Sequence, residues 1–79
     1  MRIDKYLKVS RIIKRRTVAA QACDGGRVSV NGKPVKPAYD VKIGDVITVQ
    51  FGEKSVSIEV VDLKESTGKA DAPGMYREV

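Results

Sequence analysis

Residues 2–24 read RIDKYLKVSRIIKRRTVAAQACD, a stretch that contains two short helical patterns joined by a charged connector. Over residues 3–9 the apolar side chains recur three and four positions apart, which predicts a helix with one buried stripe. Residues 16–24 repeat this spacing with small side chains that allow close packing against a neighbour. The two predicted apolar faces consist of Ile3, Tyr6 and Leu7, and of Val18, Ala19, Ala22 and Cys23.

Beyond Gly25-Gly26, which is expected to end the second helix, the hydrophobic period changes to two. Apolar side chains alternate with polar ones in three segments, and this alternation is typical of half-buried β-strands. The segments are 28–30, 45–51 and 55–62. Asn31-Gly32 predicts a turn into a short return strand, 33–35, which Pro34 restricts to a sheet edge. We therefore expect an α+β fold, with two short N-terminal helices packed on a small, mostly antiparallel sheet.

Two segments show no regular period. Residues 36–44 are expected to form a connector, with Val41 and Ile43 as its apolar anchors. Residues 65–79 are polar and contain glycine and proline, so we expect a flexible C-terminal tail. Docking of Met75-Tyr76 against the sheet remains the alternative. The expected organisation is one domain over residues 1–64, followed by this tail.

The composition limits the possible functions. A chain of 79 residues forms one small domain with a modest core. It contains no histidine and one cysteine, Cys23, so we expect no metal site, no cofactor and no catalytic residue. The carboxylates are scattered over predicted turns and strands without a second group at acid–base spacing, so the protein is not expected to be an enzyme. No apolar run approaches the roughly 20 residues of a membrane span. We expect a soluble, cytoplasmic protein without a membrane partner.

Positive charge is concentrated near the amino terminus. Seven of the fifteen lysines and arginines fall within the first sixteen residues, where only Asp4 opposes them, and the whole chain carries +5. Such a surface attracts nucleic acid, because each neutralised phosphate releases counterions. Guanidinium groups suit structured RNA, whereas four aromatic residues are too few for a single-strand stacking platform. Asp4 is expected to cap the helix or to orient Arg16 or Lys5. The expected RNA contacts are Arg2, Lys5, Arg11, Lys14, Arg15, Arg16, Lys33 and Lys36.

The spacing of these residues resembles a known family. The shared pattern comprises Arg2-x-Asp4-Lys5-x-Leu7, Ser10-Arg11, Arg16-Thr17-x-Ala19, Gly26-Arg27-Val28-x-Val30-Asn31-Gly32 and Gly44-Asp45. It is similar to the ribosomal protein S-four-type RNA-binding domain, also called the alpha-L motif, over about residues 1–50. Among stand-alone members the chain looks most like the RqcP (YabO-like) group. The related heat-shock protein fifteen group usually has a longer basic C-terminal extension.

This resemblance implies a function on the ribosome. It implies a non-enzymatic factor that binds a stalled large ribosomal subunit, where it contacts large-subunit rRNA and the P-site peptidyl-tRNA. There it is expected to act as a monomer and to support alanine tailing of the stalled chain together with RqcH, a NEMF-type factor. Two alternatives stay open. One is a general large-subunit recycling factor of the heat-shock protein fifteen type, and the other is a basic module that docks an acidic protein.

Overall fold

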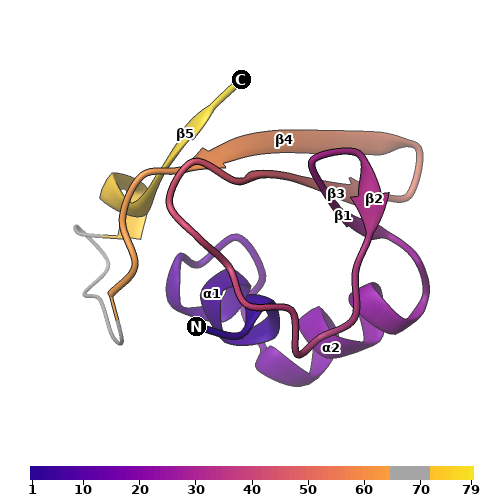
Figure 1. Ribbon diagram of the computed structural model, residues 1–79. Helices are drawn as coiled ribbons and strands as arrows, with labels where there is room; N and C mark the ends of the chain where they lie inside the picture. Colours follow the sequence, from indigo (N-terminus) through magenta and orange to yellow (C-terminus); the bar gives the residue numbers. More distant parts are fainter. Residues whose placement is uncertain (65–71) are drawn as a thin grey trace.

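The computed structural model describes residues 1–64 and 72–79, which form two helices beneath a five-stranded sheet (Figure 1). The helices are α1 (Ile3–Val9) and α2 (Arg16–Asp24). The strands are β1 (Val28–Val30), β2 (Lys33–Pro34), β3 (Val46–Phe51), β4 (Lys54–Val60) and β5 (Tyr76–Glu78), and the 3-10 turn η1 (Ala72–Met75) precedes β5. The predicted α+β architecture, including the bounds of both helices, is confirmed.

The sheet is antiparallel throughout, with the strand order β2-β1-β3-β4-β5. Its longest ladder joins β3 and β4, from Val46 opposite Glu59 to Phe51 opposite Lys54. β2 lies at one edge of the sheet. Pro34 has no N–H to donate, and an edge strand tolerates this because no further strand pairs with it. The predicted turn before β2 has positive φ angles of 51° at Asn31 and 87° at Gly32, which suit a two-residue hairpin loop.

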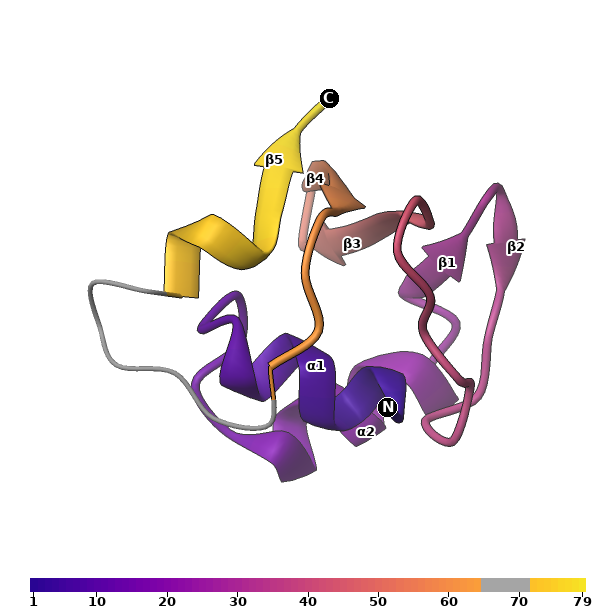
Figure 2. The ribbon, with the colours of Figure 1, turned by 60° about the vertical axis from the view of Figure 1, so that its left-hand side comes forward.

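Both helices cover the same face of the sheet (Figure 2). Their inward side chains and the alternating strand residues form one core, in which the largest fully buried side chains include Tyr6, Ile3, Leu7, Ile47 and Ile58. Two expected core residues are instead exposed, Val18 by 45% and Ile43 by 64%. Val18 lies on the flank of α2. Ile43 lies in a tight turn, closed by the hydrogen bond from Asp45 N–H to the Lys42 carbonyl, and this turn directs it outward.

The C-terminal residues differ from the expectation of a flexible tail. β5 pairs with β4, and the Met75 side chain is fully buried against the core. The Tyr6 hydroxyl donates a hydrogen bond to the Met75 carbonyl at 2.8 Å, so η1 is attached to α1. Docking of Met75-Tyr76, the alternative interpretation, is what the structure shows for residues 72–79. The rest of the expected tail, residues 65–71, lies outside the described residues. Across the described parts of the chain, no helix is long and apolar enough to cross a membrane.

Candidate nucleic-acid interface

Asp4 lies at the centre of the amino-terminal cations. Its side chain is only 5% exposed, and its carboxylate accepts hydrogen bonds from Arg2 Nε and Nη2 at 3.2 and 3.1 Å. The Arg16 guanidinium forms an ion pair with the same carboxylate at 3.4 Å. Oδ1 of Asp4 also accepts the backbone N–H of Lys5 at 2.7 Å. One buried carboxylate therefore orients two arginines, one preceding α1 and one at the start of α2.

The two arginines nevertheless face solvent. The Arg2 side chain is 53% exposed and that of Arg16 is 47% exposed, so each guanidinium has edges left for an external anion. The two cations share one negative charge, and the cluster as a whole remains positive. The sequence predicted that Asp4 caps the helix or orients Arg16 or Lys5, and the structure shows the ion pair with Arg16. It did not predict the contact with Arg2, which depends on the extended backbone of Arg2 before the helix.

The connector between β2 and β3 holds the start of α1. The carbonyl of Tyr39 accepts the N–H of Ile3 at 2.8 Å, and the carbonyl of Pro37 accepts the N–H of Asp4 at 3.4 Å. These two N–H groups have no partner within the helix, so the connector satisfies them. Lys36 directly precedes Pro37 and is exposed. The Lys36 side chain lines a shallow hollow beside Cys23 and Asp24, at the carboxyl end of α2.

Asp45 holds the other end of this connector. Its carboxylate accepts hydrogen bonds from the Tyr39 hydroxyl at 3.1 Å, from the Lys42 N–H at 3.0 Å and from the Asn31 amide at 3.3 Å. Burial and the hydrogen bond to Asp45 raise the pKa of Tyr39. Tyr39 therefore anchors the connector. Asn31 and Asp45, two residues of the family pattern, thus join the connector to the start of β3.

The segment between the helices carries a second group of cations. Ser10 is buried, and its hydroxyl donates to the Leu7 carbonyl at 3.4 Å. The next residue, Arg11, has a φ of 63°, a left-handed conformation that redirects the chain away from α1. Ile13 returns to the core and is 6% exposed. The cations of this segment, all exposed, are Arg11, Lys14 and Arg15.

The structure places the eight expected contacts in separate parts of the surface. Arg2 and Arg16 contact the Asp4 carboxylate, and Lys5 follows Asp4 on α1. Lys36 lies in the connector, beside Asp24 at the end of α2. The second group occupies the segment between the helices. Lys33 stands apart, because it lies on β2 at the edge of the sheet (Figure 2). The sequence places Lys33 and Lys36 three residues apart, but the short strand ends between them.

Cys23 is the only thiol and lies on the buried face of α2. Burial and the nearby carboxylates of Asp4 and Asp24 raise its pKa to about 11, so the thiol is protonated at neutral pH. A protonated, buried thiol is a poor nucleophile and metal ligand. In the described part of the chain, no group of three or more histidine, cysteine, aspartate or glutamate side chains is placed to hold a metal ion.

Comparison with known proteins defines the class to which this fold and this cluster belong. The family model of the S4 domain matches residues 1–47, which include both helices and the connector up to the start of β3. The chain therefore belongs to the S4 domain family. The resemblance predicted from the residue pattern is confirmed.

Two groups within that family are especially similar. The chain is 54% identical over 76 residues to the RQC P-site tRNA stabilizing factor of Bacillus subtilis, covering 96% of this chain and 88% of that protein. The corresponding factor of Streptococcus pneumoniae is also 54% identical, covering 96% and 86%. A solved trimeric structure of Vibrio cholerae heat shock protein 15 superposes with a TM-score of 0.93 at 34% identity, covering all of this chain and 81% of that one.

Proposed function

We propose that this protein is a non-enzymatic RNA-binding factor of the large ribosomal subunit that acts in ribosome-associated quality control. The similarity to factors named for stabilising P-site tRNA supports this role, because it extends over 96% of the chain. The geometric observation that carries the proposal is the cluster of Arg2 and Arg16 on the buried carboxylate of Asp4.

This cluster suits a rigid polyanion for a physical reason. Immobilising a long side chain on binding costs about 0.5–1.5 kcal/mol. In this protein the ion pairs with Asp4 restrict both arginines before any RNA arrives. Each guanidinium keeps exposed edges that can hold two phosphate oxygens at once. Fixed cations from two elements therefore match phosphates at fixed spacings, as structured RNA presents them.

The finer assignment extends the same proposal. The Asp4 cluster and the cations between the helices contact large-subunit rRNA and the P-site peptidyl-tRNA, and the protein bridges these two RNAs. Held in this way, the tRNA stays in place while RqcH, the NEMF-type factor, directs alanine tailing of the stalled chain. We propose that one copy of the chain suffices, so the protein acts as a monomer without a cofactor.

Loss of one arginine tests the proposed surface. Arg16→Gln is expected to weaken co-sedimentation with purified large ribosomal subunits about tenfold or more, since hydrogen bonds to charged groups contribute about 1.5–3 kcal/mol. The salt dependence should also become shallower, by about 0.7–0.9 in the slope of log K against log salt. Arg77→Gln is the matched control: it removes the same charge from β5, where Arg77 pairs with Glu59 at 2.7 Å. Equal binding by the two variants contradicts the proposal.

A general recycling role of the heat-shock protein fifteen type is the second candidate. It is favoured by the close superposition with Vibrio cholerae heat shock protein 15. Detection of alanine tails on stalled chains, with and without this protein, separates the two roles. A basic module that docks an acidic protein is separated from both by nuclease treatment of the captured complex, because only RNA-bridged complexes dissociate.

A further inference from the structure

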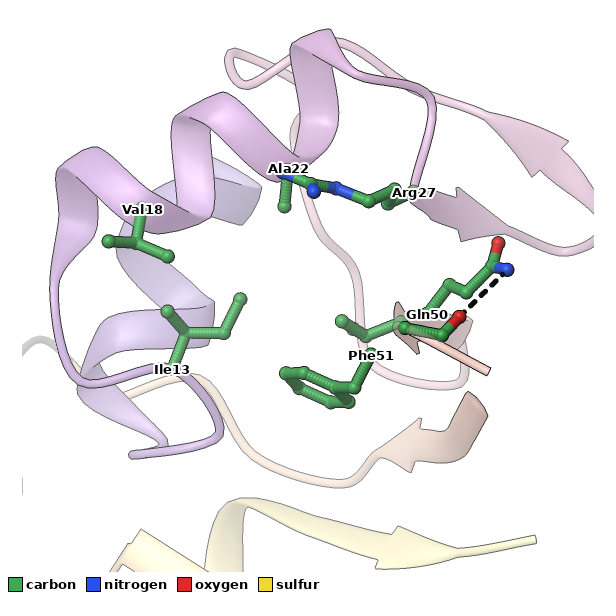
Figure 3. A pocket seen from close by; sticks show the side chains of 8 residues that line it. Ile13, Val18, Ala22, Arg27, Gln50 and Phe51 are labelled. Carbon is green, nitrogen blue, oxygen red and sulfur yellow. Dashed lines mark hydrogen bonds between the residues drawn. The ribbon is translucent and has the colours of Figure 1, made fainter. Parts of the chain in front are cut away.

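A hollow of about 310 Å³ opens between α2 and the end of β3 (Figure 3). Ile13, Val18 and Ala22 line it from the helical side, and Phe51 lines it from the end of β3. Arg16 and Val18 are two positions apart, about 200° around the helix, so they face opposite flanks of α2. An RNA that contacts both Arg16 and this hollow must therefore pass around the amino-terminal end of α2.

Phe51 is exposed for a structural reason. It shares the parity of Ile47 and Val49 and so lies on the face of the sheet that the helices cover. At the end of β3, however, α2 no longer covers this face, and Phe51 is 44% exposed. The chain turns directly after Phe51, where Gly52 has a φ of 61° and its carbonyl accepts the Gln50 side-chain amide at 3.2 Å. The hollow thus presents an aromatic ring to solvent.

The polar wall of the hollow is cationic. Arg27 extends across it towards Ala22, and Gln50 is turned away (Figure 3). Among the described residues, no carboxylate lines the hollow and no ion pair joins Arg27 to an acidic side chain. Lys14 and Arg15 follow Ile13 directly in the chain and are exposed. The hollow thus combines apolar walls with a guanidinium that no carboxylate of the described residues neutralises. This combination is complementary to a flat ring that is attached to a negatively charged group.

We propose that this hollow binds one unpaired nucleobase of the RNA, with the base against the Phe51 ring and the adjoining phosphate on Arg27. The inference rests on the proposed function, because it assumes that an RNA is held at the Asp4 cluster. The volume lies at the lower end of the range for ligand sites, about 300–1,000 Å³, which suits a single base. Proteins commonly recognise unpaired bases by stacking them on aromatic side chains.

Binding to large ribosomal subunits tests the role of the ring. Phe51→Leu keeps an apolar side chain of similar size but removes the aromatic face. It is expected to weaken binding to purified large subunits about tenfold, within the range measured for loss of base stacking. Arg27→Gln is expected to weaken binding to a similar degree. Ile43→Ala is the control, because Ile43 is an exposed aliphatic residue outside the hollow. Thermal unfolding of each variant verifies that it is folded.

Ultraviolet cross-linking of the wild-type protein on the same subunits identifies the occupant. After nuclease and trypsin digestion, a nucleotide is expected on the tryptic peptide 43–54, which contains Phe51. Binding of Phe51→Leu equal to that of Ile43→Ala, or a cross-link from this peptide to a protein, overturns the inference. In that case a loss of binding by Arg16→Gln still supports the proposed function. If Arg16→Gln binds normally as well, the proposed function fails with the inference.

Discussion

Asp4→Asn is a substitution for which charge and geometry predict opposite effects on RNA binding. Asparagine keeps the shape of the side chain and an oxygen that accepts the Lys5 N–H, an interaction of 2.7 Å in this protein. It removes the carboxylate that both Arg2 and Arg16 contact. If the arginines act only through their charge, loss of a negative neighbour strengthens binding. If Asp4 positions them, binding weakens although the protein becomes more positive.

General magnitudes give the size of each effect. At a separation of about 8 Å, a phosphate gains about 0.5 kcal/mol when the Asp4 charge is removed, by Coulomb's law in water. Two arginines released from Asp4 lose about 0.5–1.5 kcal/mol each when the RNA immobilises them again. The positioning effect is the larger one, so we expect binding to weaken about three- to fiftyfold. The fold loses about 1 kcal/mol, because both partners of this buried carboxylate are half exposed.

The assay is co-sedimentation with large ribosomal subunits, together with thermal unfolding to verify that the variant is folded. Asp24→Asn is the matched control, because it changes the charge by the same amount at the exposed end of α2. The control is expected to bind as well as the wild type or slightly better. If Asp4→Asn binds as tightly as Asp24→Asn, the two arginines need no orientation by Asp4 and the reasoning is refuted.

Three further predictions concern the stability of the fold. Burial raises the pKa of Cys23 to about 11, above the value of about 8.5 for a free thiol. Its contribution to stability is therefore complete below about pH 8.5 and decreases as the pH rises towards 11, so urea unfolding of Cys23→Ala should depend less on pH over that interval. Tyr6→Phe removes the hydrogen bond to the Met75 carbonyl and should lower the free energy of unfolding by about 0.5–1.5 kcal/mol, measured with urea. Met75→Ala empties a fully buried site and should cost about 2–5 kcal/mol in the same measurement, whereas an unchanged midpoint would restore the interpretation of residues 72–79 as a tail.

Periodicity was sufficient to predict the two helices and strands β1 to β4, but not η1 or β5. Both helices have the predicted bounds, and the predicted edge strand at Pro34 is confirmed, because apolar spacing and proline stereochemistry are local properties. Burial on the flanks of elements was less predictable. Val18 lies on the apolar side of α2 and Phe51 on the inward-facing side of β3. Both are nevertheless partly exposed, because no neighbouring element in the described part of the chain covers them. The docking of Met75 depends on a contact with Tyr6, 69 residues away in the chain, which no local pattern reveals.

The sequence predicted which cations are available but not how they are held. The local excess of charge was visible from residue counts, and the pairing of Asp4 with Arg16 was among the expected contacts. Three other features depend on the path of the backbone. They are the extended residue Arg2, the left-handed residue Arg11 and the connector whose carbonyls accept the first N–H groups of α1. A backbone conformation that depends on hydrogen bonds between distant segments cannot be read from spacing.

These observations explain why one carboxylate persists within the most basic part of the chain. A cluster of arginines without Asp4 has a higher charge, but its side chains repel one another and move independently. A fully neutralised cluster is ordered but does not attract phosphate. With one buried carboxylate for two half-exposed guanidinium groups, the arginines are ordered and a net positive charge remains. The neighbouring connector reinforces this arrangement, because its hydrogen bonds to the start of α1 fix the backbone on which Asp4 sits.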